Sequence, residues 1–241
     1  MPKNLHYSVT PVPLRHVFQV RLHIPSNPAS ETAGLILQLP NWIAGSYMIR
    51  DFARHIVRIG ASDERGEAVA LTPLSQYSWR SAPCAGALTV VYEVFAHDTS
   101  VRTAFLDGDG GFFNATSLCL QVQGLDMVAH HLTLNTPEGC ANWQVATTLP
   151  RVDGCFSHDF GDFVAANYDE LADHPIRFGE LTWLSFHAHG VLHEVALAGH
   201  LPYLDVPRLS ADVQRICEAQ LAFFEPDQPA RAPFQRYLFM V

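Results

Sequence analysis

Histidine is the residue type that most invites a test for metal chemistry, because the chain contains 13 of them among its 241 residues. The pair His193-Glu194 begins like the zinc-binding pattern H-E-x-x-H, but Leu197 occupies the position of the second histidine. His187 and His189 would place two imidazoles on one face of a strand, although no third ligand accompanies them. We therefore predict no metal site and interpret these histidines as structural or surface residues. A small hydrolase that uses His187 and His189 with an unrecognised acidic ligand is the weakest alternative.

Other patterns that support catalysis or cofactor binding are missing from the sequence. It contains no G-x-S-x-G nucleophile turn, no phosphate-binding P-loop and no dinucleotide fingerprint. The run 107–111 is similar to a calcium loop but lacks the later ligands and the closing glutamate, so it predicts a turn. The five cysteines form no C-x-x-C, which argues against a disulfide framework and predicts reduced, mostly buried thiols. We predict neither a catalytic residue nor a bound cofactor in this chain.

The segment 39–56 carries an unusual density of aromatic and charged side chains around a Gly-Ser turn. Trp42, Tyr47, Arg50, Asp51 and Arg54 all fall within it. A plain connector needs no such set of hydrogen-bonding groups, so one interpretation is a recognition edge for a polar ligand or for another domain. The other interpretation is a structural network in which arginine and aspartate pair and fix a long loop. These five residues are the candidate substrate-binding or domain-junction residues.

The charge of the chain limits its partners. Fifteen Lys and Arg against 24 Asp and Glu give a formal net charge of −9, and no basic stretch is dense enough to neutralise a row of phosphates. Nucleic acid and an acidic membrane surface are therefore excluded as partners. No apolar run approaches the ~20 residues that cross a bilayer, and the N-terminal residues lack the apolar core of a secretory signal. We expect a cytoplasmic protein.

Short β-patterned segments separated by turn residues follow one another from residue 5 to about residue 165. Apolar and polar residues alternate over 15–24, as in a strand with one buried face. Further strands are predicted at 34–39, 55–60, 68–74, 87–96, 117–123, 131–135 and 143–147, with a hairpin connection over 61–66. Many short antiparallel strands indicate a mainly β fold, with an all-β sandwich or saddle domain over residues 1–174.

The pattern changes after residue 174. Two strands, 180–189 and 191–198, form a hairpin around Gly190, and Asp205 is predicted to cap a helix that follows. The helix over 208–224 has apolar residues at three- and four-residue spacing on one side, which are Leu209, Val213, Ile216, Cys217, Leu221 and Phe224. A final apolar strand at 237–241 stops in mid-pattern. We therefore expect 175–241 to be the truncated start of a second, α+β domain.

The run from residue 40 to residue 55 reads Pro-Asn-Trp-Ile-Ala-Gly-Ser-Tyr-Met-Ile-Arg-Asp-Phe-Ala-Arg-His. It resembles a characteristic run in the N-terminal region of the glycyl aminopeptidase family. Further matching pieces follow in the same order along the chain at 114–118, 168–171, 173–175, 205, 208–209, 216–217 and 236–239. Members of that family are zinc metallopeptidases with a thermolysin-like catalytic domain and a C-terminal PDZ domain.

The resemblance implies that residues 1–174 form the N-terminal β domain and that residues 175–241 begin the thermolysin-like catalytic domain. The family's H-E-x-x-H helix, its third zinc ligand and its PDZ domain would all follow Val241. Zinc is therefore implied for the full-length parent and not for this chain, which is expected to be inactive alone. The parent would release N-terminal glycine or another small residue from peptide substrates, with zinc polarising the scissile carbonyl and a glutamate acting as general base.

The resemblance also gives the candidate residues a role. The β domain would pack on the catalytic domain and line the substrate cleft, with Tyr47, Arg50, Asp51 and Arg54 at or beside the junction. Asp51 would then hold a substrate ammonium or pair with an arginine. The alternative is a free-standing β-sandwich module that binds a peptide or a carbohydrate through residues 42–54. Because the hairpin and the helix would expose apolar sides, we also expect self-association through them or partial disorder of 175–241.

Overall fold

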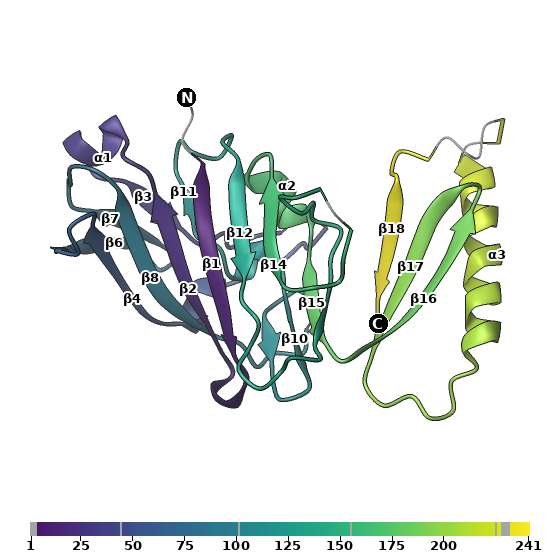
Figure 1. Ribbon diagram of the computed structural model, residues 1–241. Coiled ribbons are helices and arrows are strands. Elements are labelled where there is room, and N and C mark those ends of the chain that lie inside the picture. The colour runs from purple at the N-terminus through teal and green to yellow at the C-terminus, as the bar shows by residue number, and fades with distance from the viewer. Residues whose placement is uncertain (1–3, 44, 101, 155, 225, 228–231) are drawn as a thin grey trace.

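The computed structural model describes residues 4–43, 45–100, 102–154, 156–224, 226–227 and 232–241. Its largest sheet has the strand order β14-β12-β1-β2-β8-β4-β5 (Figure 1). The strands of this sheet are β1 (Leu5–Val12), β2 (Val17–Ile24), β4 (Ile56–Asp63), β5 (Ala68–Val69), β8 (Leu88–Phe95), β12 (His130–Leu134) and β14 (Gly161–Ala165). Neighbouring strands are antiparallel except β1 and β12, which run parallel. The predicted antiparallel character is confirmed, with this one pair as an exception.

Alternation along the strands decides which face of the large sheet points inwards. In β2 the side chains of Val20, Leu22 and Ile24 are buried, whereas Arg21 and His23 are exposed. Successive side chains of a strand point to opposite faces, so this alternation gives the sheet one apolar and one polar face. The half-buried strand predicted at 15–24 is confirmed from residue 17 onwards. Arg15 belongs instead to a short 3-10 helix, η1 (Pro13–Arg15), which begins at a proline, and His16 is the C-cap of that helix.

Two smaller sheets share the apolar core of the large sheet. Their strand orders are β13-β15-β10-β9 and β11-β3-β7-β6. Their strands are β3 (Ile36–Gln38), β6 (Leu71–Ser75), β7 (Ser78–Ser81), β9 (Phe105–Leu106), β10 (Gly110–Phe113), β11 (Gln121–Val122), β13 (Gln144–Ala146) and β15 (Ile176–Gly179). Residues from all three sheets, such as Leu22, Leu37 and Phe178, form one hydrophobic cluster. The predicted mainly β fold with a sandwich of antiparallel sheets is therefore confirmed.

Short helices connect the strands of the sandwich and were not predicted. They are α1 (Pro28–Thr32), η2 (Phe52–His55), η3 (Ala115–Ser117) and α2 (Tyr168–Asp173). Three of them begin with an asparagine cap, in which Asn27 accepts from Ala29 N, Asn114 from Thr116 N and Asn167 from Glu170 N. Each helix is too short to show a 3.6-residue hydrophobic period, so pattern analysis does not detect it.

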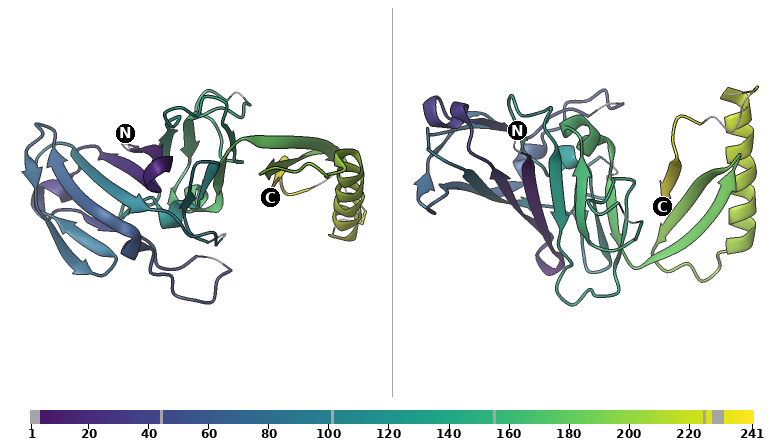
Figure 2. Two further views of the ribbon diagram at one scale, coloured as in Figure 1. Left: turned by 90° about the horizontal axis from the view of Figure 1, so that it is seen from below. Right: turned by 45° about the horizontal axis from the view of Figure 1, so that its top comes forward.

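The C-terminal part forms a separate layer beside the sandwich (Figures 1 and 2). A hairpin of β16 (Leu181–Ala188) and β17 (Val191–Ala198) turns at Gly190, which has a φ of +85°, as the sequence predicts. The helix α3 (Val206–Phe224) lies on the side of this layer away from the sandwich (Figure 1). The strand β18 (Arg236–Met240) then pairs parallel to β17, because α3 returns the chain to the start of the sheet. We call β16, β17, β18 and α3 the third layer.

The structure confirms the start of α3 and shows which part of its apolar side is covered. Asp205 Oδ1 accepts a hydrogen bond from Arg208 N at 3.0 Å, so Asp205 is the predicted N-cap. Leu209, Val213, Cys217 and Leu221 pack in the cluster that includes Leu184 and Phe186 of β16. Ile216 and Phe224, which the sequence places on the same apolar side, are 59% and 73% exposed, so this side of the helix is covered only in part. A three-stranded sheet is too narrow to cover the whole apolar side and the end of the helix.

Within the described residues, no helix combines the length and the hydropathy needed to cross a membrane. Cys84, Cys119, Cys140 and Cys217 are free thiols, of which Cys119 and Cys217 are buried and the other two half-buried. Cys155 lies outside the described residues.

A buried carboxylate on β8 connects the neighbouring strands β2 and β4 and the 3-10 helix η1. Glu93 on β8 has a side chain that is 3% exposed. It accepts hydrogen bonds from Gln19 at 2.9 Å, from Arg15 at 3.1 Å and from Arg58 at 2.5 Å. Burial alone would raise the pKa of Glu93, but these hydrogen bonds outweigh burial and hold its pKa below the usual 4.5.

The lowered pKa of Glu93 makes a pH-dependent contribution to stability. Because the folded-state pKa lies below the unfolded one, the contribution is present above the unfolded pKa and is lost as the pH falls through the folded pKa. We expect the urea midpoint of the wild type to drop more than that of Glu93→Gln between about pH 6 and about pH 3. Parallel pH profiles for the two proteins would contradict this assignment.

Candidate functional site

A half-open pocket of about 500 Å³ lies where the segment after β3 meets η3 and α2. It is lined by Pro40, Trp42, Ile43, Asn114, Thr116, Gln121, Tyr168, Asp169, Ala172 and Asp173. The lining brings together three segments that are far apart in the sequence and that all carry the family resemblance, 39–56, 114–118 and 168–175. We call this cavity the α2 pocket.

Asn114 holds two walls of the α2 pocket in place. Its Oδ1 accepts hydrogen bonds from Thr116 N at 3.0 Å and from Thr116 Oγ1 at 2.7 Å, which fixes the start of η3. Its Nδ2 donates to Ala172 O at 2.8 Å, which attaches η3 to α2. Tyr168, at the start of α2, is buried, and its hydroxyl donates to Cys119 O at 2.8 Å. These polar side chains of the wall therefore pair with each other or with backbone carbonyl groups.

The third wall is the first part of the long loop between β3 and η2. Phe52 and Ala53 are buried in the sandwich core and anchor the end of this loop. Nearer its tip, Arg50 N donates to Asn41 O at 2.5 Å, and Ser46 N donates to Ile43 O at 3.1 Å. In the left view of Figure 2 the loop, in dark blue, reaches out from the sandwich.

The five residues predicted from the sequence do not converge on one point. Trp42 lines the α2 pocket and is 52% exposed, whereas Tyr47 is fully exposed. Arg50 is half-buried and donates from Nε and Nη2 to Ser46 Oγ at 3.2 Å, so it braces the loop. Asp51 and Arg54 are exposed. Among the described residues no ion pair joins an arginine to an aspartate within this loop.

Asp169 and Asp173 were missed as candidates by sequence reasoning. They stand four residues apart on α2, both are exposed, and both line the α2 pocket. Among the described residues neither forms an ion pair with Lys or Arg. The only signal in the sequence was their position in the matching segments 168–171 and 173–175. Their relation to Trp42 depends on contacts across more than a hundred residues, which no local pattern records.

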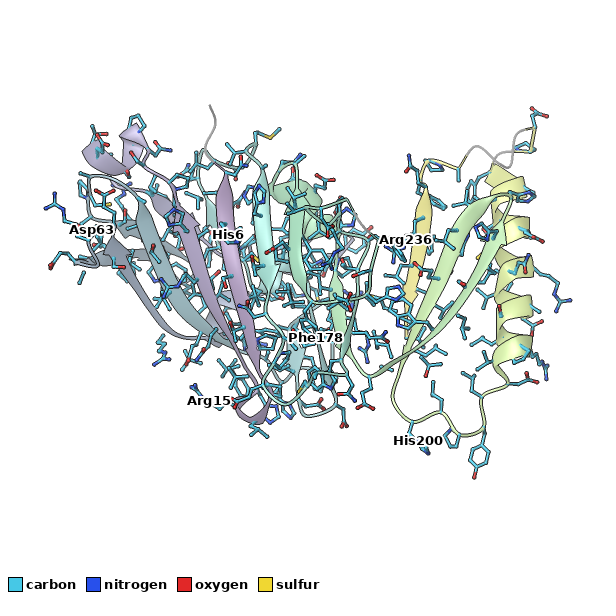
Figure 3. The ribbon with its side chains drawn as sticks, in the orientation of Figure 1. His6, Arg15, Asp63, Phe178, His200 and Arg236 are labelled. Carbon is cyan, nitrogen blue, oxygen red and sulfur yellow. The ribbon has the colours of Figure 1, made fainter. Side chains whose placement is uncertain are left out.

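A second polar cluster, the seam, joins the third layer to the sandwich. At its centre is Glu194 on β17, whose side chain is 6% exposed. Glu194 Oε2 accepts from Arg236 Nε of β18 at 2.5 Å, and Glu194 Oε1 lies 3.3 Å from His158 Nε2 of the sandwich. Arg236 also donates from Nη1 to Thr147 O at 3.2 Å and covers the Phe156 ring at 4.2 Å. Figure 3 shows Arg236 on the edge of the third layer that faces the sandwich.

Ring stacking completes the seam. The imidazole of His158 lies flat on the indole of Trp183, with centroids 3.6 Å apart and an interplanar angle of 5°. Trp183 Nε1 in turn donates to Gln144 Oε1 at 3.0 Å. Burial lowers the pKa of His158, although the Glu194 carboxylate acts in the opposite direction. The described hydrogen bonds, ion pairs and ring contacts of the seam thus come from 144–158 of the sandwich rather than from 42–54.

The histidines considered for metal binding have different surroundings. His193 is buried on β17, where its ring stacks on Phe186 and Tyr237 and its Nδ1 lies 3.0 Å from Val191 O. His187 and His189 do not share a strand face, because His189 lies in the turn after β16 with a φ of +47°. Among the described residues no group of three His, Cys, Asp or Glu side chains could hold a metal ion. These residues therefore do not fit a catalytic zinc.

Solved structures with the same fold are aminopeptidase-like proteins. An aminopeptidase N family protein from Idiomarina loihiensis matches 98% of this chain with 40% sequence identity and a TM-score of 0.89. An M1 zinc metallopeptidase from Deinococcus radiodurans matches 98% of the chain with 13% identity and a TM-score of 0.50, which is a likeness of fold alone. The chain spans only 39% of the length of the first protein and 55% of the second.

No curated protein sequence matches the chain. The family model described as "Peptidase M61 N-terminal domain" matches residues 6–180, which include every strand of the sandwich except part of β1. The match therefore covers well over half of the chain, including all three walls of the α2 pocket and the sandwich side of the seam. This chain belongs to the peptidase M61 N-terminal domain family.

Proposed function

We propose that the chain is the non-catalytic N-terminal portion of a zinc metallo-aminopeptidase. The parent protein, of the glycyl aminopeptidase type with a PDZ domain, would release N-terminal glycine or another small residue from peptides. The observation that carries the proposal is the family match over residues 6–180. The Idiomarina protein supports it, because that aminopeptidase N family protein is similar over 98% of this chain and is much longer. In the parent protein, zinc would be held by residues that lie outside the 241 residues of this sequence.

We also propose that the chain contains one complete domain and the beginning of a second. Two separate hydrophobic clusters support a division near the predicted boundary between 1–174 and 175–241. β15 (Ile176–Gly179) pairs with β10 and β13 and therefore packs with the first cluster. This favours a boundary at Gly179, just before β16.

The loop that carries the predicted residues is proposed to face the rest of the parent protein. Tyr47, Met48 and Ile49 are 100%, 62% and 71% exposed at its tip, which is unusual for three consecutive apolar residues. Packing on the catalytic domain and lining the substrate cleft would cover them. Tyr47, Arg50, Asp51 and Arg54 are then proposed as junction or substrate-binding residues.

A second candidate function is a peptide- or carbohydrate-binding module, and the α2 pocket is the observation that favours it. A cavity of about 500 Å³ has the size of a small-ligand site.

A cytoplasmic location remains part of the proposal. Self-association through α3 is proposed as well, because Ile216, Phe223 and Phe224 are 59%, 75% and 73% exposed.

The test of the aminopeptidase proposal uses native protein purified from its source. We expect it to contain stoichiometric zinc and to release glycine from glycyl peptides, with loss of activity after chelation and recovery after zinc is added back. The 241-residue chain, assayed in parallel, should do neither. A zinc-loaded native protein that leaves peptide amino ends intact would refute the proposed activity, and stoichiometric zinc with peptidase activity in the 241-residue chain would refute its non-catalytic role.

A further inference from the structure

A half-open hollow of about 230 Å³ lies on the polar face of the large sheet, across β1, β2, β8 and β4. Its lining includes the polar side chains of Ser8, Thr10, Gln19, Arg21, Arg58 and Glu93. The strand register places Ser8 directly opposite Arg21, and Glu93 directly opposite Arg58. Because alternate residues of a strand share one face, these side chains from four strands meet at one place. We call this cavity the sheet hollow.

Two hydroxyl groups of the sheet hollow have unused donors. Asn135 Nδ2 donates to Ser8 Oγ at 3.0 Å and to Thr10 Oγ1 at 2.8 Å. A hydroxyl oxygen that accepts a hydrogen bond keeps its own proton for another acceptor. Among the described residues, neither of these two hydroxyl protons has an acceptor. The Asn135 amide thus leaves both hydroxyls to act as donors toward a ligand.

The arginines around the sheet hollow outnumber its carboxylate. Glu93 is nearly buried and is shared by Arg15 and Arg58, so one positive charge of this group is not balanced. Arg21 is exposed and adds a second positive charge, because its guanidinium has no hydrogen-bond or ion-pair partner in the described part of the chain. Three arginines and one carboxylate give a local formal charge of +2, whereas the whole chain carries −9.

The acceptors near the sheet hollow are few. Asp162 on β14 does not line it, accepts from Thr133 Oγ1 at 2.5 Å, and is separated from β1 by β12. Gln19 donates from Nε2 to Glu93 at 2.9 Å, so its Oε1 remains as a neutral acceptor. A ligand that fits this set is an anion with several acceptor oxygens and one hydroxyl donor.

We propose that the sheet hollow binds a phosphate dianion, either free or as the end group of a small phosphate ester. The oxygens of phosphate lie on all sides of the phosphorus, so they can accept from the hydroxyls of β1 and from Arg21 on β2 at the same time. Two negative charges balance the local charge of +2. A carboxylate carries one charge and has both oxygens on one side, so it fits these donors less well. The inference goes beyond the proposed aminopeptidase function and does not depend on it.

The test is calorimetric titration of the 241-residue chain with inorganic phosphate, with glycerol 3-phosphate and with acetate. The buffer contains no phosphate and has an ionic strength of about 0.15 M, at which attraction between exposed charges is largely screened. We expect at least one of the two phosphate compounds to bind with a dissociation constant of about 1 mM or lower, and at least about tenfold more tightly than acetate. The tighter of the two identifies whether the ligand is free phosphate or a phosphate ester.

Arg21→Gln tests the site without removing a contact within the protein. It should weaken phosphate binding at least about tenfold, because it removes a charged donor. Arg21→Lys keeps the charge and should lose less. Arg80→Gln is the matched control, because Arg80 is also an exposed strand arginine without an ion pair among the described residues but lies on β7 of another sheet. Circular dichroism shows whether each variant is folded.

Four results would overturn the proposal. They are no binding of either phosphate compound at this ionic strength, equal affinity for acetate, unchanged binding in Arg21→Gln, and an equal loss in Arg80→Gln. None of them affects the zinc and glycine-release test on the native protein, so the sheet hollow can fail while the aminopeptidase proposal stands. An inactive native protein whose N-terminal chain still binds phosphate would leave the sheet hollow in place and refute only the proposed activity.

Discussion

Replacing Glu194 with alanine is expected to cost about 3 kcal/mol of folding free energy and to loosen the third layer first. Arg236 and His158 would lose the carboxylate they share, while their side chains stay only 21% and 23% exposed. A cation left without its partner in such a place destabilises the fold more than the pair stabilised it. Amide hydrogen exchange should therefore show faster exchange over 181–241, with the sandwich still protected.

The controls separate the charge of Glu194 from its shape and from general surface effects. Glu194→Gln keeps an acceptor for Arg236 and should lose less stability than Glu194→Ala. Asp212→Ala removes a carboxylate that pairs with Arg208 and Arg215 on the exposed side of α3, and should change stability by less than about 1 kcal/mol. If exchange over 181–241 is the same in Glu194→Ala and in the wild type, the seam does not hold the layers together.

Phe178→Ala is expected to lower the free energy of unfolding of the sandwich by about 3–5 kcal/mol. The ring of Phe178 is 1% exposed and lies within 5.6–6.1 Å, between centroids, of the rings of Phe18, Trp143 and Phe160. Its removal leaves a cavity at the point where β15, β10 and the large sheet meet (Figure 3). Urea unfolding followed by far-UV circular dichroism measures the loss.

Gly111 offers a specific control for this packing. An added Cβ at Gly111 would lie 2.3 Å from Phe178 Cζ, so Gly111→Ala should overpack the wild-type core. In the Phe178→Ala background the same methyl group has room, and the two changes should be less than additive. Tyr47→Ala, at a fully exposed aromatic, should change stability by no more than about 0.5 kcal/mol. Additive effects of Gly111→Ala and Phe178→Ala would show that these groups do not share a space.

The two expected losses fall on different parts of the molecule. Phe178 belongs to the cluster of the sandwich, and Glu194 belongs to a seam of polar and stacked groups between two clusters. Burial of aromatic area stabilises the sandwich around Phe178. The seam instead depends on the Glu194 carboxylate, whose partners are His158 and Arg236. The domain boundary that we propose at Gly179 lies between these two residues, because Phe178 precedes it and Glu194 follows it on β17. Different unfolding of 5–179 and 181–241 in the Glu194→Ala variant would support that boundary.

The sequence by itself determined the features that depend on neighbouring residues. The alternation in β2, the turn at Gly190 and the cap at Asp205 all follow from contacts within a few positions, and each is present in the structure. The same local reasoning made Trp42 a candidate site residue, and in the structure Trp42 lines the α2 pocket. It also favoured a mainly β fold, because strand alternation and turn residues are legible without knowledge of partners.

Only the tertiary structure decided which distant residues meet. The parallel pairing of β1 with β12 joins Leu5 to His130, and no local pattern specifies such a partner. Asp169 joins Trp42 at the α2 pocket for the same reason, and Glu194 becomes the centre of the seam only when β18 and 144–158 are in place. Burial and charge balance are properties of the folded surroundings of a side chain. The type of a residue therefore shows which reactions and contacts it is capable of. The fold supplies its partners, and these partners decide which of those reactions and contacts it makes.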